Sequence, residues 1–468
     1  MRVPTTSLPP TEGGVVVDIH DIIARTSSVP KVPVPDSSFA VESIVVGLKE
    51  CGLLFFDNMQ PLIKLPLCYR RISIDQEETL IFNLLDEQAQ VGVSNVQIRE
   101  AMKRIRFMPF LQIDLKAQFW KSQLYVNLTS GIYDIMKQEI VPLRNELVFD
   151  YCINIRYIPH SKLEDAPVFK HFVETSLGME QLKCLLRVLG YCISCLTKSR
   201  KAFVFYGIGR TGKSTILNVL ETVIGEGFVS HEPFHNMSGE RAKAHYEGKL
   251  VNISRETSAK VNKQEECFKS LVSCEYTTGS EKFEKQRDFI ATLSFVFAGN
   301  SDVDFAVMDD AILDRLVYLM FTREIPEEEI DLELESKLLA EKDAIFSMAL
   351  DSLRDLIREK YDFRMSAVAE EHIQHRRFLI HSAESFLQKR CSLSEKGRVS
   401  KVTLYDAYKV FCDANALKPE TRNRFYARVR NYDNGIKDGR VVDKTGSSVQ
   451  GFHGIALCNA EIQPDAED

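Results

Sequence analysis

The sequence predicts an α/β fold, and three patterns support this prediction. Apolar runs typical of strands alternate with polar or helical segments over residues 201–325. A glycine-rich turn joins the first of these strands to a helix that is expected to begin at Gly212. Ahead of this region, residues 169–197 carry apolar side chains at spacings of three and four, which indicates a pair of helices. The middle of the chain is therefore expected to form a sheet that helices cover.

The strands of this sheet can be placed one by one. They are expected at AFVFYG, LVNIS, ATLSFVFAGN and RLVYLMF, in that order along the chain. Just before the sheet, YVNLTSGIYDIMKQEIVPL predicts a strand, a Ser-Gly turn and a second strand. After the sheet, residues 326–390 are rich in Glu, Leu and Ala and should be helical.

These patterns divide the chain into successive parts. In order, we expect a flexible segment at 1–38, an α+β domain of unknown role at 39–124, a mainly helical region at 125–200, the α/β core at 201–325, a helical region at 326–390, a small C-terminal domain at 391–460 and an acidic tail at 461–468. The small domain should contain helices at 403–414 and 420–432, followed by short strands that end in GFHGIAL.

The bulk composition excludes several classes of protein. With 468 residues, 44% hydrophobic and 27% charged, the chain is neither a fibre nor wholly disordered. Its net charge of −7 excludes a uniformly basic nucleic-acid coat. No apolar run approaches the roughly 18 residues of a spanning helix, and the N-terminus lacks the layout of a secretory signal. We therefore expect a cytoplasmic protein with no membrane contact, and Cys192 and Cys195 as reduced core thiols.

The stretch from Gly207 to Ser214, GIGRTGKS, matches G-x-x-x-x-G-K-[ST] at every fixed position. Such a loop turns its backbone N–H groups toward phosphate oxygens, and the helix that follows adds its partial positive charge. Lys213 would reach the β- and γ-phosphates, and Ser214 would ligate Mg²⁺. The sequence therefore predicts that ATP and Mg²⁺ are held by the following residues: Gly207, Ile208, Gly209, Arg210, Thr211, Gly212, Lys213, Ser214 and Thr215.

Three further residues have the types that hydrolysis requires. Glu256 follows the strand LVNIS and could orient the attacking water and help to hold the metal. Asn300 ends the strand LSFVFAG and could sense the γ-phosphate. Arg315 precedes the strand LVYLMF and could neutralise charge in the transition state, a role that a neighbouring subunit often supplies. Each is weak alone, because strands often end in a polar turn residue, and their order carries more weight.

This order of motifs resembles that of superfamily 3 helicases, and more closely the primase-helicases of phages, plasmids and poxviruses. The resemblance covers about 125–458 and is most specific in the α/β core. It implies a P-loop, AAA+-like ATPase core, a helical collar at 125–200 and a C-terminal winged helix. It also implies a ring, usually a hexamer, that binds ATP between subunits and draws one DNA strand through its pore.

The resemblance also assigns roles by position. Lys213, Glu256, Asn300 and Arg315 become the catalytic residues, with Glu256 activating water and Arg315 acting across the subunit interface. Ser214 and Glu256 become the metal-site residues. The stretch between Glu256 and Asn300 would hold the pore hairpin.

In that stretch, TGSEKFEKQRDF combines Lys282, Lys285 and Arg287 with the aromatic Phe283. Cations beside an aromatic ring suit the backbone and bases of single-stranded DNA. The alternative, a solvated charged loop, stays open.

Two departures from the family pattern bear on these roles. Members often carry an acidic residue just before the strand-ending Glu, whereas this chain has Arg255, which could weaken metal binding or slow hydrolysis. Many relatives also carry a primase domain. No acidic pair in the N-terminal 124 residues suits nucleotide polymerisation, so we expect no priming activity and a separate primase or polymerase as partner.

The C-terminal domain predicts contact with forked or duplex DNA on separate grounds. Lys and Arg outnumber Asp and Glu between 418 and 444, in a chain of negative net charge. Arg422, Arg424 and Arg428 lie on the helix expected at 420–432, with Phe425 and Tyr426 between them. Surface charge without a ligand is the open alternative.

The leading hypothesis is an ATP-dependent DNA helicase of a mobile element or virus, which forms a homo-hexamer and translocates on single-stranded DNA during replication. The alternative is a nucleotide-binding, DNA-binding scaffold or replication initiator with slow or absent hydrolysis, which Arg255 keeps open. A third hypothesis, an NTPase with no DNA role, conflicts with the basic C-terminal helix.

Overall fold

The computed structural model describes residues 31–34, 37–142, 147–255, 264–280, 286–303, 305, 308–417, 419–442 and 446–458. Most of the expected flexible segment and the whole acidic tail therefore lie outside the described residues. The chain forms two compact units. The first comprises residues 1–307 and 314–366, and the second comprises residues 308–313 and 367–468. No helix in the described part of the chain is both long and apolar enough to cross a membrane.

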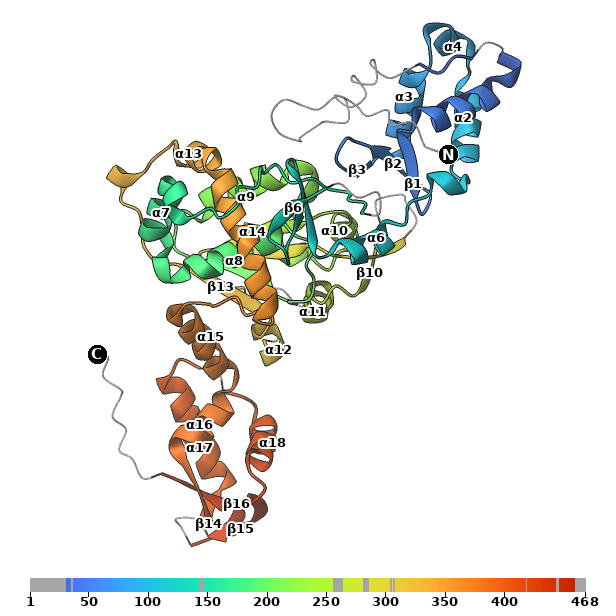
Figure 1. Ribbon diagram of the computed structural model, residues 1–468. Helices are drawn as coiled ribbons and strands as arrows, with labels where there is room; N and C mark the ends of the chain where they lie inside the picture. The colour runs from blue at the N-terminus through green and yellow to red at the C-terminus, as the bar shows by residue number, and fades with distance from the viewer. Residues whose placement is uncertain are drawn as a thin grey trace. The chain divides into compact units, whose positions relative to one another are not determined.

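A central parallel sheet lies in the first unit (Figure 1). Its strand order is β13-β7-β12-β9-β8. The strands are β7 (Ala202–Gly207), β8 (Val229–Ser230), β9 (Val251–Ser254), β12 (Ser294–Gly299) and β13 (Leu316–Phe321). Their side chains are almost all buried, which explains why they read as continuous apolar runs. The predicted α/β class and the four predicted strands are confirmed; β8, with two residues, is too short to leave a sequence pattern.

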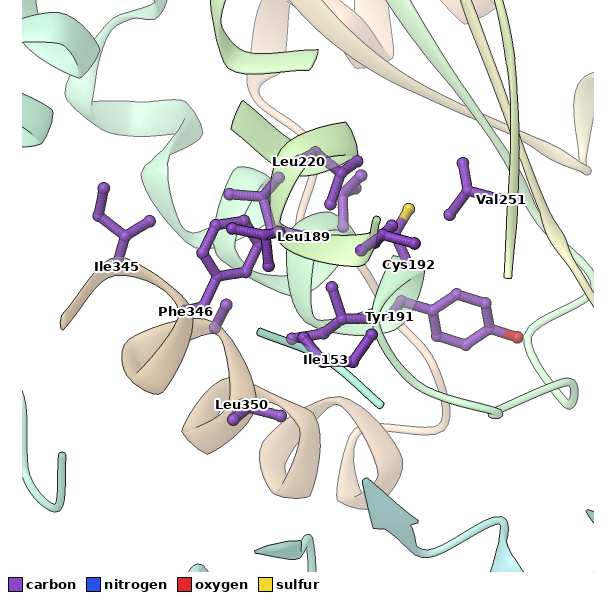
Figure 2. Close-up of a cluster of buried hydrophobic side chains, with 14 of the residues drawn as sticks. Ile153, Leu189, Tyr191, Cys192, Leu220, Val251, Ile345, Phe346 and Leu350 are labelled. Carbon is purple, nitrogen blue, oxygen red and sulfur yellow. The ribbon is translucent and has the colours of Figure 1, made fainter. Parts of the chain in front are cut away.

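Helices cover this sheet and close the main hydrophobic core. Three helices share this core with the strands: α8 (Leu182–Cys192), α9 (Lys213–Ile224) and α14 (Lys342–Arg358). Figure 2 shows Leu189, Leu220 and Leu350 from these three helices in one cluster of buried side chains. Cys192 and Cys195 are both buried, as the sequence predicts for core thiols.

Helices α8 and α14 pack closely because Gly190 has no side chain. A Cβ on Gly190 would lie 2.4 Å from the carbonyl oxygen of Ala349 in α14. Near the end of this contact, the fully buried Arg187 donates to Glu359 Oε2 at 3.0 Å. Arg187 Nη1 donates to both Glu359 and the carbonyl of Asp362, whereas Nε and Nη2 have no hydrogen-bond partner among the described residues.

The region expected to be mainly helical at 125–200 begins as an antiparallel sheet. Its strands are β4 (Tyr125–Leu128), β5 (Gly131–Asp134) and β6 (Glu139–Val141). The strand-turn-strand prediction is correct for the first two strands and misses β6, whose residues are mostly polar or half-exposed. Helices follow only afterwards, as α7 (Pro167–Phe172), a π-helical turn at Val173–Leu177, and α8.

The N-terminal part of the first unit has its own core and mixes helices with a small antiparallel sheet, β1-β2-β3. Serine caps with reciprocal glutamine bonds fix the starts of two of its helices, at Ser73 and Ser94. Its elements are α2 (Ala40–Cys51), β1 (Leu54–Asp57), β2 (Gln60–Lys64), β3 (Tyr69–Arg71), α3 (Ile74–Leu84), α4 (Glu87–Gly92), α5 (Asn95–Ile105) and α6 (Leu115–Ser122).

A hairpin lies between β9 and β12 in sequence. Strand β10 (Tyr276–Gly279) pairs antiparallel with β11 (Arg287–Ile290), and Gly279 lies opposite Arg287. Two short helices precede it, α10 (Glu240–Ala244) and α11 (Glu265–Val272). The hairpin occupies the place where the sequence analysis expects a pore hairpin, while residues 281–285 at its tip lie outside the described part of the chain.

The second unit is built around a sheet of order β14-β16-β15. Its core is aromatic, with Phe425 stacked on Tyr408 at a ring-centroid distance of 4.3 Å. The elements are α12 (Asp310–Leu313), α15 (Ala367–Ile380), α16 (Ser382–Arg390), β14 (Cys391–Ser400), α17 (Lys401–Ala414), α18 (Arg422–Tyr432), β15 (Lys437–Val442) and β16 (Ser448–Leu457). Asp310 of α12 accepts from His381 at 2.7 Å, so this short helix, which lies between β12 and β13 in sequence, belongs to the second unit.

Candidate nucleotide and nucleic-acid sites

The glycine-rich loop predicted to bind phosphate runs from the carboxyl end of β7 to the first turn of α9. Gly212 has φ +85°, and a Cβ at this position would lie 2.7 Å from Phe172 and 3.1 Å from Ser176 Oγ. At Gly207 a Cβ would meet the carbonyl of Phe321 at 1.9 Å. Both positions therefore require glycine, one because of its backbone conformation and the other because of the neighbouring strand β13.

The backbone of this loop is arranged to bind an anion. Within the part of the chain that the structure describes, the N–H groups of residues 209–215 have no hydrogen-bond acceptor. Ile208, Gly209, Arg210 and Ser214 are exposed, so several of these donors lie on an accessible surface. Consecutive unpaired donors ahead of a twelve-residue helix, α9, give a concentration of positive potential that phosphate oxygens can neutralise.

Lys213 is the buried cation of this loop. Its ammonium group donates to the carbonyl of Gly207 at 2.7 Å, to Thr211 Oγ1 at 3.0 Å and to the carbonyl of Ile208. Burial lowers the pKa of Lys213, because desolvation disfavours the charged form. Since its partners are neutral, a phosphate group would supply the negative charge that the described residues do not. The residues of the loop thus fit the phosphates of a nucleotide, and Ser214 lies exposed in the first turn of α9.

The other predicted catalytic residues lie at opposite ends of the parallel strands, some at the carboxyl ends and one at the amino ends. Asn300 is exposed and directly follows Gly299, which pairs with Tyr206 of β7, so Asn300 lies on the same edge as the loop. Strand β9 also ends on this edge, because Ser254 pairs with Phe297 in a parallel ladder. Glu256 follows two residues later and lies outside the described residues.

Arg315 lies at the opposite end of the sheet, where the parallel strands begin. Strand β13 runs parallel to β7, with Leu316 opposite Ala202 and Phe321 opposite Gly207. A strand of this length spans about 20 Å, so Arg315 cannot reach the loop of its own chain. Its Nη2 lies 3.4 Å from Ser273 Oγ, just after α11.

Arg255 points toward α9 and away from the loop. Its guanidinium donates to Asn218 Oδ1 and Glu221 Oε2, both at 2.8 Å. Glu221 lies about 12 Å along the helix from Lys213, since each helical residue rises about 1.5 Å. The positive charge of Arg255 is therefore neutralised at a distance from the phosphate loop. The sequence analysis missed these partners because they lie on another element and follow no motif.

Phe172 and Ser176 are a second group that the sequence did not reveal. Both lie behind Gly212, and Ser176 Oγ is buried without a partner among the described residues. They come from α7 and the π-helical turn that follows it. Only their apolar environment is visible in the sequence, so no pattern links them to the loop.

The residues predicted to bind DNA fall into two groups. Lys282, Phe283 and Lys285 lie outside the described residues, and the structure places only the strands of their hairpin. The C-terminal group lies on α18, where Arg422, Arg424 and Arg428 are all exposed.

The three arginines of α18 differ in their surroundings. Arg428 forms ion pairs with Glu384 at 3.1 Å and Glu420 at 3.6 Å. Arg422 lies over the ring of Tyr405, with 5.4 Å to its centroid. Arg424 has no recorded side-chain partner among the described residues, which makes its charge the most available of the three.

The aromatic residues between these arginines have structural roles. Phe425 is fully buried in the core of the second unit, and the hydroxyl of Tyr426 donates to the carbonyl of Lys401 at 3.0 Å. Neither ring is presented on the exposed face of α18 together with Arg424. No group of three or more His, Cys, Asp or Glu side chains with the arrangement of a metal site occurs among the described residues.

Comparison with known proteins gives a partial match to one family model and a likeness of fold. Residues 205–315 match the model of a family of unknown function, DUF5906. This match extends from β7 through the loop, Asn300 and Arg315, so it covers the predicted nucleotide site and less than half of the chain. No curated protein matches the sequence.

Two solved structures of the NrS-1 C terminal region resemble the chain. One, of residues 305-718 in that protein, has a TM-score of 0.53 and 12% identity, and covers 86% of this chain and 95% of the NrS-1 chain. The other, an A form, has a TM-score of 0.52 and 12% identity, and covers 86% and 96%. At this identity the likeness concerns the fold, and it extends over nearly the whole NrS-1 region.

Proposed function

We propose that the protein is an ATP-dependent DNA helicase that acts in replication of a mobile element or virus. The observation that carries the proposal is the glycine-rich loop, where the N–H groups of residues 209–215 have no acceptor among the described residues and, with the buried Lys213, fit the phosphates of ATP. ATP with Mg²⁺ would be held there by the loop and by Ser214. The bound metal would neutralise charge on the phosphates, and Glu256 and Asn300 would serve at the same edge of the sheet.

The position of Arg315 supports a site shared between subunits. Because Arg315 lies at the far edge of the sheet from its own loop, it can act in hydrolysis only at the loop of another subunit. A head-to-tail contact of this kind forms a ring when its rotation closes, and a homo-hexamer is the closed assembly that the family resemblance implies.

The DNA-binding part of the proposal rests on the second unit and the hairpin. The succession α16, β14, α17, α18, β15, β16 with sheet order β14-β16-β15 supports a winged helix in which α18 is the recognition helix. The β10–β11 hairpin supports a pore loop that contacts a single strand. The likeness to the NrS-1 C terminal region supports the assigned fold over most of the chain.

The proposal is tested by mixing two inactive variants. Lys213→Ala should lose ATPase activity because the phosphates lose their cation, and Arg315→Ala should bind ATP without turnover. In a randomly mixed ring, about a quarter of the interfaces combine an intact loop with an intact Arg315, so activity should partly return. The measurement is steady-state ATP hydrolysis with and without single-stranded DNA. If Arg315→Ala alone hydrolyses ATP at the normal rate, the shared site is wrong.

The same assay separates the helicase from the alternative, a nucleotide-binding scaffold or initiator. A scaffold would assemble on ATP binding and would show no DNA-stimulated turnover. The contact of Arg255 with Glu221 removes the main reason to expect slow hydrolysis, because the charge of Arg255 is directed away from the loop.

A further inference from the structure

A cavity of about 520 Å³ lies in the first unit, apart from the phosphate loop. It is formed by β1 and β3 of the N-terminal part, by α6, and by the β10–β11 hairpin. Five carboxylates line it, from Asp57, Asp114, Asp150, Glu247 and Asp288, against the cations of Arg71 and Lys116 among the described residues. The cavity is therefore acidic, in contrast to the basic surface that DNA requires.

Its floor holds a guanidinium that is shared among carboxylates. Arg71 forms ion pairs with Asp57 at 2.7 Å and with Glu247 at 3.5 Å. Asp150 interacts electrostatically with Arg71, Asp57 and Glu247, and it makes no ion pair with any described residue. Burial raises the pKa of Asp150, against the attraction of Arg71 and together with the repulsion of Asp57 and Glu247. Among the described residues, no second cation faces these carboxylates.

The walls of the cavity are aromatic. Phe119 and Trp120 come from α6, and Tyr276 and Phe289 come from the hairpin. Trp120 is 48% exposed and Tyr276 is 63% exposed, so both rings are accessible. The ammonium group of Lys116 already lies over the ring of Tyr276, 4.5 Å from its centroid, which shows that this wall accommodates a cation.

We propose that this cavity is a docking site for a basic peptide segment of a partner protein, which inserts an arginine or lysine side chain between the rings and toward Asp150. The aliphatic stem of such a side chain would pack on the aromatic walls, while its charged head would balance the carboxylates of the floor. This site does not depend on the ATPase or helicase activity proposed above.

Two other ligand classes fit the cavity less well. A metal ion would need a group of carboxylates converging at ligand distance, and the described residues form no such group. An unpaired nucleobase could stack on Trp120, but its phosphates would meet the excess of carboxylates around the opening. Charge complementarity favours the basic peptide.

Trp120 is the single tryptophan of the chain, so its fluorescence reports on this cavity. The full-length protein is titrated with a short oligo-arginine peptide, with a glycine-serine peptide of equal length, and with a single-stranded oligonucleotide. We expect a saturable change in Trp120 emission with the arginine peptide and none with the glycine-serine peptide, and a peptide affinity that falls with salt.

Variants assign this binding to the cavity floor and wall. Asp150→Asn should weaken the arginine peptide by about tenfold or more, because it removes a carboxylate that makes no ion pair with any described residue. Tyr276→Ala, at an exposed position, should weaken it by about threefold to tenfold through the lost ring contact. Glu328→Gln removes one charge from an exposed part of the first unit that the cavity does not include, and should leave the affinity within about twofold.

Three results would overturn the proposal. One is the absence of a saturable change with the arginine peptide. A second is equal peptide affinity for Asp150→Asn and the unaltered protein, given that the emission of the free variant is unchanged. A third is a saturable change with the oligonucleotide alone, which would assign the cavity to a nucleobase.

Discussion

At the scale of single residues, Gly212 shows how strictly the phosphate loop is shaped. Its φ of +85° disfavours any side chain, and a Cβ would press on the ring of Phe172. Gly209, three residues earlier, has open space around the corresponding position and no positive φ. The two glycines therefore differ in what they contribute to the loop, although both belong to the same motif.

Gly212→Ala should distort the loop and abolish ATP binding, and should lower the free energy of unfolding by about 1–3 kcal/mol. Gly209→Ala is the matched control and should leave that free energy within about 0.5 kcal/mol. Nucleotide binding followed by calorimetry and unfolding in urea check both variants. Normal ATP binding by Gly212→Ala would mean that the loop does not hold the phosphates in the proposed way.

The position of Arg255, just before Glu256, suggests slow hydrolysis. Its contacts, however, are with Asn218 and Glu221 of α9, away from the glycine-rich loop. Arg255→Gln should change the ATPase rate by less than about threefold, because the lost charge is already neutralised by Glu221. The ion pair is partly exposed, so its loss should cost about 0.5 kcal/mol of stability. A large increase in the ATPase rate of this variant would show instead that Arg255 restrains the site.

At the scale of elements, the packing of α8 on α14 depends on a buried charge. Hydrogen bonds from Arg187 and then from Arg364 hold the pKa of Glu359 at about 2, below its ordinary value. Because this pKa is lowered on folding, the ionised Glu359 stabilises the protein above the unfolded pKa of about 4.3. That contribution is lost as the pH falls from there through about 2.

Glu359→Gln should therefore lower the urea midpoint at neutral pH, since Arg187 is left buried without its anionic partner. The gap between this variant and the unaltered protein should narrow as the pH is lowered from about 5 toward 3. Glu328→Gln, at an exposed position, is the control and should show no such gap. A gap that stays constant with pH would contradict the role assigned to Glu359.

Two arginines of α18, Arg424 and Arg428, should have different roles. Arg424→Ala should weaken binding of duplex DNA and reduce the slope of its salt dependence by about one, because this charge has no side-chain partner among the described residues. Arg428→Ala should mainly lower the stability of the second unit, because Glu384 and Glu420 lose their cation. Fluorescence anisotropy at several salt concentrations distinguishes these effects. Equal salt slopes for the two variants would remove Arg424 from the DNA interface.

At the scale of the whole molecule, sequence patterns located the elements that are buried on both faces or defined by fixed spacing. The strands β7, β9, β12 and β13 are continuous apolar runs, and the loop before α9 matches a motif with glycine and lysine at fixed spacing. Short or half-exposed strands such as β6 and β8 leave no such pattern. They form only because neighbouring strands supply hydrogen bonds.

Contacts between distant segments were not predictable for a related reason. The partners of Arg255, the residues behind Gly212 and the ion pairs of Arg428 all join elements that are separated in sequence. A single sequence records the type of each residue and its local period, whereas these pairings depend on the tertiary arrangement. The roles of Lys282, Phe283, Lys285 and Glu256 stay predictions, since these residues lie outside the described part of the chain.

The assignment of α12 to the second unit has a topological consequence. The chain leaves the first unit after residue 307, returns at Asp314, and leaves again after residue 366, so three covalent connections join the units. The second of these connections leads within one residue to Arg315. The backbone at 313–314 therefore joins the second unit directly to the start of β13, one residue from Arg315.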